Sequence, residues 1–347
     1  MKRLIIGLLT VVLLAGLVLS TGCTKPVVEE EKLPVVEEEK LLIVTLWQVG
    51  TVDFCVPVRI GAEDAAEKYG VDSEWLFPSN FDILEQIGMV ESLISKGEVD
   101  GLVLQSNDPA TLIPVVKRAV KAGIPVVLSN ELNEREGFDS FCGADGIEIG
   151  KLMGKELASN LLGEGVWAKA VGYEGTGEVE GKIAFMTDGP GYLSLEMRLK
   201  GARDYLSQFP GIEDLGTYDS TLDQVKAQEA AVNILTANPD LAGFVSVGAM
   251  PTVAIGMAVQ EMGLTGKVII SGMDLLPQEL ELVKSHVVAS LVGQDQYGQG
   301  YIPVQYLSEY LLNNKPLPRF LPTNLEVVNL ENIDSIIERE EAYMKKK

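Results

Sequence analysis

The chain has 347 residues, with 50 Asp and Glu against 28 Lys and Arg, and therefore a formal net charge of −22. A surface this acidic repels nucleic acids and anionic lipids, and because no basic cluster reverses it, nucleic-acid binding is excluded. His286 is the single histidine and no cysteine pair has ligand spacing, so we expect no metal site, no cofactor and no histidine-based catalytic triad.

The first 22 residues have the pattern of a secretory signal peptide. Two basic residues precede an apolar run from Leu4 to Leu19, which is too short and too close to the start for a membrane span. The run ends in Leu19-Ser20-Thr21-Gly22-Cys23, which resembles a lipobox, where small residues precede a cysteine that is lipidated before cleavage. We therefore expect a signal peptide over residues 1–22 and a lipidated Cys23. The alternative is an ordinary secretory signal with an incidental cysteine.

Residues 23–40 are predicted to form a lipidated acidic tether. The segment Pro26–Lys32 is repeated as Pro34–Lys40, and a short charged duplication of this kind cannot bury a core. Six of the acidic and five of the basic residues precede Leu41, so residues 41–347 keep a net charge of −21. That part is long enough for two ordinary domains.

After the tether, short β-rich runs alternate with helical patterns, which predicts layers of parallel strands and helices. A first set of strands is expected at Leu41–Trp47, Val71–Phe77, Gly101–Gln105, Pro125–Leu128 and Phe141–Ala144. The helices between and after them are expected at Phe54–Tyr69, Asp82–Lys96, Ala110–Ala122 and Ile147–Leu162.

The alternation then starts again. A second set of strands is expected at Lys182–Thr187, Leu215–Tyr218, Gly243–Val247, Val268–Ser271 and Val288–Gly293. Its helices are expected at Ser194–Gln208, Gln224–Ala237, Thr252–Met262, Gln278–Lys284 and Tyr301–Leu312. Two successive sets of similar length imply an α/β fold of two similar lobes, each built on a doubly wound parallel sheet.

Glycines interrupt this alternation in residues 163–181. The Gly175-Thr176-Gly177 segment lacks both the spacing and the leading strand of a dinucleotide-binding motif, so we expect a long flexible loop at a lobe boundary. Within this segment, Trp167 and Tyr173 could pack on a lobe or reach a partner. His286 is expected to be exposed in a helix-to-strand turn.

Two cysteines remain once Cys23 is assigned to the anchor. Cys55 and Cys142 could form one disulfide in an oxidising compartment, but the sequence does not give their separation. We favour two small buried thiols, and the disulfide stays open as the alternative.

Several segments together resemble the type I periplasmic solute-binding family, in its sugar-binding branch that includes ribose- and xylose-binding proteins. The most telling is the strand and helix start at Gly101–Ala110, followed by the Ala-Gly-Ile-Pro-Val-Val entry to the next strand at Ala122–Val127. Further similar segments are Ala237–Leu241, Ser271–Asp274, Gly293-Gln294, Leu325–Val328 and Glu331–Ile333. The resemblance covers essentially everything from Leu41 to about Glu340.

The resemblance implies two lobes joined by a three-segment hinge, with residues 41–144 and 295–322 in the N-terminal lobe and 145–294 and 323–347 in the C-terminal lobe. It implies a monomer that closes on a small solute and delivers it to ABC permease and ATPase subunits. The protein would be lipid-anchored on the outer face of the cytoplasmic membrane or in the periplasm.

The family's ligand contacts carry over to ten positions of this chain. They are Trp47, Gln48, Phe54, Asn130, Glu131, Glu196, Arg198, Met250, Asp274 and Gln294. Phe54 and Met250 could instead belong to the core. Glu131 and Glu196 stand where sugar binders often have Arg, which exchanges fixed donors for acceptors and positive charge for negative.

We therefore expect capture of a monosaccharide or similar small polyhydroxylated solute for an ABC transporter. The charge exchange leaves open a polyol, an amino sugar or another amine-bearing solute, and a sensory protein with the same fold is a further alternative. A transcription regulator is excluded because the signal peptide occupies the place of its DNA-binding helices. Catalysis by paired carboxylates such as Glu131 and Glu196 is not expected.

Overall fold

The structure is a computed structural model, and it describes residues 40–80, 82–106, 108–130, 138–189, 191–221 and 223–346. The predicted signal peptide, Cys23, almost all of the tether, and Glu131 lie outside the described residues. Within these ranges no helix has the length and apolar character needed to cross a membrane.

The first of two six-stranded sheets is built entirely from parallel pairs, in the order β11-β5-β4-β3-β1-β2. Its strands are β1 (Leu42–Leu46), β2 (Asp72–Leu76), β3 (Gly101–Leu104), β4 (Val126–Ser129), β5 (Ser140–Gly143) and β11 (Phe320–Pro322). Four helices flank it: α1 (Cys55–Tyr69), α2 (Ile83–Lys96), α3 (Pro109–Lys121) and α10 (Gln296–Asn313). We call this part the N-terminal lobe.

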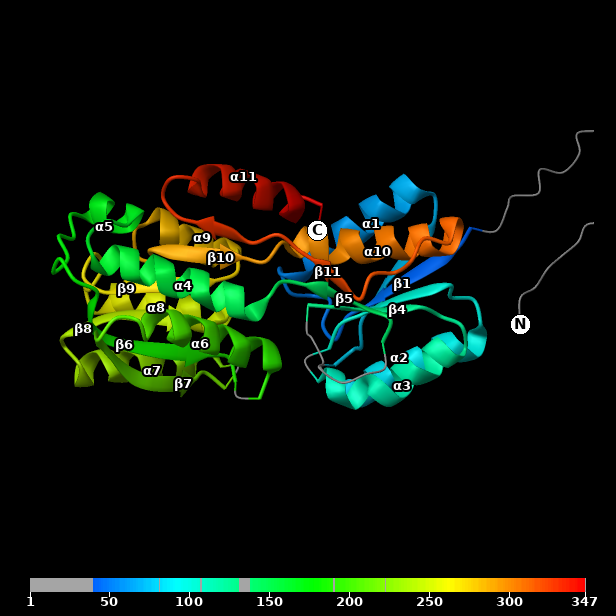
Figure 1. Cartoon of the computed structure of the whole chain (residues 1–347), viewed down its shortest axis with the longest axis horizontal. Coiled ribbons are helices and arrows are strands. Elements are labelled where there is room, and N and C mark those ends of the chain that lie inside the picture. Colours follow the sequence, from blue (N-terminus) through cyan, green and yellow to red (C-terminus); the bar gives the residue numbers. More distant parts are fainter. Residues whose placement is uncertain are drawn as a thin grey trace, which may run out of the picture. The chain divides into compact units, whose positions relative to one another are not determined.

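Alternate residues of the central strands enter two separate apolar clusters, one on each face of this sheet. Val44 and Leu102 pack with α2 and α3, whereas Ile43 and Val103 pack with α1 and α10. Figure 1 shows α2 and α3 on one side of the strands and α1 and α10 on the other. Burial on both faces explains why these strands are almost continuously apolar.

The second sheet has the order β12-β10-β9-β8-β6-β7 and is parallel except for β12, which runs antiparallel to β10. Its strands are β6 (Glu180–Thr187), β7 (Gly211–Asp219), β8 (Leu241–Ser246), β9 (Ile269–Met273), β10 (Ser290–Gly293) and β12 (Glu326–Val328). The helices of this C-terminal lobe are α4 (Gly146–Leu161), α5 (Val166–Val171), α6 (Leu193–Leu206), α7 (Gln224–Ala237), α8 (Ala249–Glu261), α9 (Pro277–Lys284) and α11 (Ile333–Met344).

The chain passes between the two sheets three times. The crossovers follow β5, β10 and β11, and the last strand of each sheet comes from the C-terminal part of the chain. The predicted α/β fold of two similar parallel-sheet lobes is therefore confirmed. Most predicted elements are present with ends shifted by a few residues, but α10 begins at Gln296, five residues earlier than expected.

Residues 163–181 differ from the expected long flexible loop. They contain the short helix α5, and Trp167 is fully buried in the C-terminal lobe, where its indole Nε1 donates to the carbonyl of His286 at 2.7 Å. Tyr173 packs on Trp167 with ring centroids 5.9 Å apart. The two aromatic side chains pack on the lobe rather than reaching outward, and His286 is half-buried rather than exposed.

Cys55 and Cys142 are both buried free thiols. Burial raises the pKa of the Cys55 thiol to about 12, and it raises the pKa of Cys142 as well. The preference for two small buried thiols is confirmed.

Glycines allow two helix pairs to pack backbone against backbone. A Cβ atom added at Gly150 of α4 would lie 1.9 Å from the carbonyl oxygen of Arg198 in α6, and one at Gly201 of α6 would lie 2.1 Å from that of Ile147. In the N-terminal lobe, a Cβ at Gly300 of α10 would lie 1.8 Å from the carbonyl oxygen of Val58 in α1. This close contact between α4 and α6 positions the backbone of Arg198, which lies in α6.

We predict that Gly150→Ala destabilises the protein by about 1–3 kcal/mol, because the methyl group must push α6 away from α4. Gly88→Ala is the matched control, since Gly88 is exposed in α2 with no atom near its added Cβ. That control should be neutral or stabilising by about 0.5–1 kcal/mol. Urea unfolding measures both, and an unchanged midpoint for Gly150→Ala would show that the helices do not touch.

Candidate functional site

Polar and aromatic side chains gather where the parallel strands of both sheets end. Trp47, Asn130, Asp188, Asp274 and Gln294 each stand directly after a strand, namely β1, β4, β6, β9 and β10. The carboxyl ends of parallel strands are where such folds bind ligands. These residues line one cavity of about 260 Å³, together with Val49, Val52, Phe54, Cys55, Gln105, Tyr192, Leu195 and Arg198. We call it the central cavity.

Left-handed backbone conformations occur at two of these strand ends. Asn130 has φ 67° and Asp274 has φ 75°, and Asp295, directly after Gln294, has φ 56°. Asn and Asp tolerate this region better than other non-glycine residues, and such conformations are frequent at functional sites. Of these three residues, Asn130 and Asp274 line the central cavity.

One wall of the central cavity is aromatic. The Trp47 ring lies 5.9 Å from the ring of Phe54 and 5.8 Å from that of Trp75, with tilted planes. Trp47 is only 1% exposed, and Phe54 is half-buried at the start of α1. Phe54, which contacts the buried Trp47, therefore supplies the accessible apolar face against which a flat, weakly polar surface can pack.

A hydrogen-bonded network of polar side chains forms the opposite wall. Arg198 donates to the carbonyl of Val247 at 3.1 Å and to Gln294 Oε1 at 3.4 Å. Gln294 Nε2 in turn donates to Asp274 Oδ1 at 2.7 Å. Behind them, Gln299 Nε2 donates to Gln294 Oε1 at 3.2 Å and fixes the orientation of that amide. The network holds a guanidinium, an amide and a carboxyl in one rigid surface.

Four buried polar atoms, each in a residue that lines the central cavity, have no hydrogen-bond partner among the described residues. Two are donors, Trp47 Nε1 and Arg198 Nε, and two are acceptors, Asn130 Oδ1 and Asp188 Oδ1. An unmade hydrogen bond of a buried group costs about 1–3 kcal/mol, so native proteins rarely leave several in one place. Their grouping marks a surface that is completed by a ligand with both donors and acceptors.

The carboxyl groups of the cavity have pKa values above their usual range. Burial, reinforced by the charge of Asp274, raises the pKa of Asp188 to about 7, although Arg198 opposes the shift. Burial also raises the pKa of Asp274, against the effects of Arg198 and of the hydrogen bond from Gln294. A third carboxyl, that of Glu279, is fully buried, and burial raises its pKa well above the usual value for a glutamate. The Arg198 guanidinium thus compensates two of these carboxyls, Asp188 and Asp274.

The structure brings six of the ten predicted ligand residues to the central cavity: Trp47, Phe54, Asn130, Arg198, Asp274 and Gln294. Gln48 is buried beside it, where its Oε1 accepts from Ser106 Oγ at 3.2 Å. Glu196 is exposed in the first turn of α6, and Met250 is half-buried in α8; neither lines the cavity. Glu131 lies outside the described residues.

Sequence reasoning missed Gln105, Asp188 and Tyr192. Gln105 and Asp188 each stand at the end of a predicted strand, so the rule that ligands bind at strand ends could have selected them. Tyr192 immediately precedes α6, where no sequence pattern distinguishes it from any other helix-capping position.

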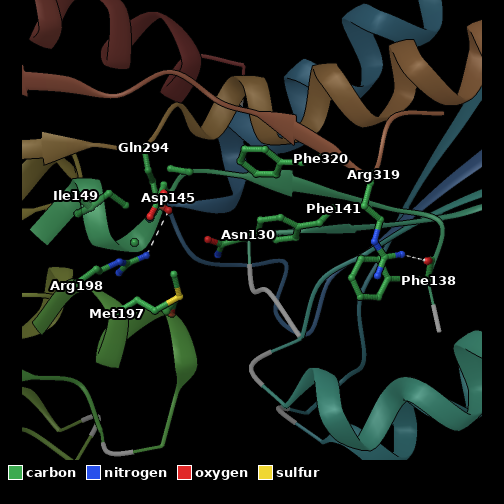
Figure 2. A pocket seen from close by; sticks show the side chains of 13 residues that line it. Asn130, Phe138, Phe141, Asp145, Ile149, Met197, Arg198, Gln294, Arg319 and Phe320 are labelled. Atoms are coloured by element: carbon green, nitrogen blue, oxygen red, sulfur yellow. Dashed lines mark hydrogen bonds between the residues drawn. The ribbon is translucent and has the colours of Figure 1, made fainter. Parts of the chain in front are cut away.

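A second cavity of about 350 Å³ adjoins the first (Figure 2). It shares Asn130, Arg198 and Gln294 with the central cavity, and its other lining residues are Phe138, Phe141, Ala144, Asp145, Gly146, Ile149, Ser194, Met197, Arg319 and Phe320. Figure 2 shows Phe141, Phe320 and Phe138 on the N-terminal side and Met197, Ile149 and Arg198 across from them.

Comparison with known proteins agrees with this geometry. Residues 43–315 match the family described as periplasmic binding protein domain. The chain is 25% identical over 266 residues to the D-allose-binding periplasmic protein of Escherichia coli, which covers 76% of this chain and 83% of that protein. It is 22% identical over 307 residues to the xylose/arabinose-binding protein of Sulfolobus acidocaldarius, covering 84% and 71% respectively.

Solved structures give the same result. The sugar-binding protein of a sugar ABC transporter from Bacillus halodurans superimposes with a TM-score of 0.77 at 26% identity, covering 86% of this chain and all of that one. A periplasmic solute-binding protein from Actinobacillus succinogenes with bound D-allose superimposes with a TM-score of 0.75 at 25% identity, covering 85% and 100%.

We predict that Asp188→Asn stabilises the ligand-free protein more at pH 8 than at pH 5. A carboxyl whose pKa is raised in the folded state favours folding at low pH, and this contribution is lost as the pH rises through about 7. The stability difference between the variant and wild type should therefore grow by about 1–3 kcal/mol from pH 5 to pH 8. Chemical unfolding at both pH values measures it.

Asp204→Asn is the control for this experiment, because Asp204 is exposed on α6 and its carboxylate pairs with a surface lysine, Lys200. Its effect on stability should be the same at pH 5 and pH 8. If Asp188→Asn behaved like this control, Asp188 would be an ordinary solvated carboxylate.

Proposed function

The chain belongs to the periplasmic binding protein family, and from this premise we propose that it captures a monosaccharide or similar small polyhydroxylated solute for an ABC transporter. The observation that carries the proposal is the set of two unpartnered donors and two unpartnered acceptors that belong to residues lining the central cavity. Each hydroxyl of a sugar both donates and accepts, so a sugar can satisfy such a mixed set.

The shape and chemistry of the cavity support a sugar ring. Phe54, packed on the buried Trp47, offers an aromatic face for its C–H groups, while Asp274, Gln294 and Arg198 offer an acceptor, an amide and a donor in fixed positions. A solute that leaves one of these groups unpaired loses about 1–3 kcal/mol of binding energy, which is how such a site selects its cargo.

The relatives are binding proteins of transporters rather than enzymes, and several are named or crystallised with D-allose, arabinose, xylose or ribose. We propose that the lobes close on the solute by bending at the three crossovers, and that the closed form docks on a permease driven by an ATPase. The relatives are named as components of import systems and transporters. These names support a role in transport rather than delivery of a signal molecule to a receptor.

A second candidate cargo is an amine-bearing sugar or polyol. The observation that favours it is the excess of carboxyls in the central cavity, where Asp188 and Asp274 face a single guanidinium. A protonated amine would compensate the charge of the second carboxylate. With a neutral sugar bound, Asp188 would instead have to stay protonated to avoid an uncompensated charge.

Family membership gives an extracytoplasmic location, and we propose that a lipid on Cys23 anchors the chain there as a monomer. The anchor rests on the order of basic residues, apolar run, small residues and cysteine at the N-terminus. More than one acyl chain on Cys23 holds a protein stably on a membrane, and the acidic repeat after it would act as the spacer.

We predict that D-allose, D-ribose, D-xylose or L-arabinose stabilises residues 40–347 in a thermal-shift screen. A sugar at a thousandfold over its Kd adds about 4 kcal/mol, a shift of several degrees. Asp274→Asn should weaken the binding of that sugar about 10- to 100-fold, because the amide no longer accepts as a charged group. Asp204→Asn should leave the affinity unchanged.

Hexosamines and amino polyols belong in the same screen. A response to them alone would support the amine-bearing cargo, and a flat response across both panels would remove sugar capture as the function.

We also predict that Cys23→Ser releases the protein from the membrane. In a bacterial host, the wild-type protein should sediment with membranes and incorporate labelled palmitate, and the variant should do neither. Wild-type protein that stays soluble and unlabelled would show that Cys23 is incidental and that residues 1–22 are an ordinary signal.

A further inference from the structure

We propose that the second cavity is a subsite for an apolar substituent on the sugar, so that the cargo is a glycoside with an aryl or alkyl aglycone. We call this cavity the aromatic compartment, defined by Phe138, Phe141, Ile149, Met197 and Phe320. The inference rests on the proposed capture of a sugar, and it names the class of cargo more narrowly than a free monosaccharide.

The aromatic compartment adjoins the central cavity. Asn130, Arg198 and Gln294 line both, so these three side chains stand at the boundary between the two spaces. A ligand held by Arg198 and Gln294 on one side therefore has the compartment next to it. This contiguity lets one molecule occupy both spaces.

The walls of the compartment are suited to an apolar group. The rings of Phe141 and Phe320 are stacked, with centroids 5.9 Å apart and planes at 10° (Figure 2). Phe141 is buried, but Phe320 is 46% exposed although it lies on a strand that pairs with β5. An exposed large aromatic residue that continues a buried aromatic wall is a favourable surface for an aryl or alkyl group to cover.

The polar groups of the compartment, apart from the shared wall, already have partners. Asp145 caps α4 by accepting from the backbone nitrogen of Ile147 at 2.8 Å. The Arg319 guanidinium lies over the Phe138 ring, 4.0 Å from its centroid, and donates to the carbonyl of Phe138. Outside the shared residues the lining is mainly aromatic and apolar, so an apolar aglycone matches these walls better than the many hydroxyls of a second sugar ring.

The position of the compartment near the crossovers also means that it persists when the lobes close. Ala144 and Asp145 belong to the crossover after β5, and Gln294 belongs to the crossover after β10. Points close to a rotation axis move least, so lobe closure about these segments changes the compartment less than the outer cleft. The aglycone would be held in the closed form as well.

The test is calorimetric titration of residues 40–347 with the free sugars D-allose, D-ribose, D-xylose and L-arabinose, and with the phenyl α- and β-glycosides of each. We expect at least one phenyl glycoside to bind about tenfold more tightly than its parent sugar. Phe320→Ala should remove most of that gain while changing the affinity for the free sugar less than about twofold.

Tyr310→Ala is the matched control, because Tyr310 is an aromatic residue of similar exposure on α10 and lines neither cavity. It should leave both affinities unchanged. Thermal unfolding of both variants establishes that each is folded, and truncation of an exposed ring makes a loss of folding unexpected.

Three outcomes would overturn the inference. Free sugars that bind while every phenyl glycoside is rejected would show that the compartment is no subsite, and the proposed function would stand. Glycosides that bind equally well to wild type and Phe320→Ala would place the aglycone elsewhere. If neither free sugars nor glycosides bind, the proposed function itself fails.

Discussion

The guanidinium of Arg198 compensates the two carboxyls, Asp188 and Asp274, that line the central cavity with it. It is 5% exposed and is the only Lys or Arg side chain among the described residues of that cavity. Removing one partner from a buried ionic group typically costs about 3–5 kcal/mol, because the other charges are left uncompensated. The position of this side chain is therefore a condition for the whole site.

Several features of the fold serve that position. Gly150 and Gly201 let α4 and α6 touch, which sets the backbone of Arg198, while the carbonyl of Val247 and the amide of Gln294 fix its guanidinium. Parallel strands in both sheets deliver the other polar groups to the same edges. Burying these groups without partners raises the free energy of the ligand-free protein, and this cost is removed when ligand hydroxyls complete the network. The same residues therefore account both for the cost to the free protein and for the selectivity of binding.

The sequence predicted the fold well because strand and helix patterns are local and strongly periodic. Six of ten proposed ligand positions line the cavity, and four of them, Trp47, Asn130, Asp274 and Gln294, directly follow strands, whose ends the resemblance to a family places reliably. Glu196 and Met250 lie on helices, where one residue of register turns a side chain by about 100° away from the cleft. Residues 163–181 were expected to form a flexible loop because glycines around a short helix resemble one, and the hydrogen bond from Trp167 to the distant carbonyl of His286 cannot be predicted from local sequence.

A crystal structure of residues 40–347 with the sugar that binds most tightly tests the central claim most directly. The account predicts a sugar ring in the central cavity, with hydroxyls within hydrogen-bond distance of Asp188 Oδ1, Arg198 Nε and Asp274, and a C–H face on Trp47 or Phe54. A ligand bound away from these groups, or one whose hydroxyls leave Arg198 Nε and Asp188 Oδ1 unpaired, would contradict it.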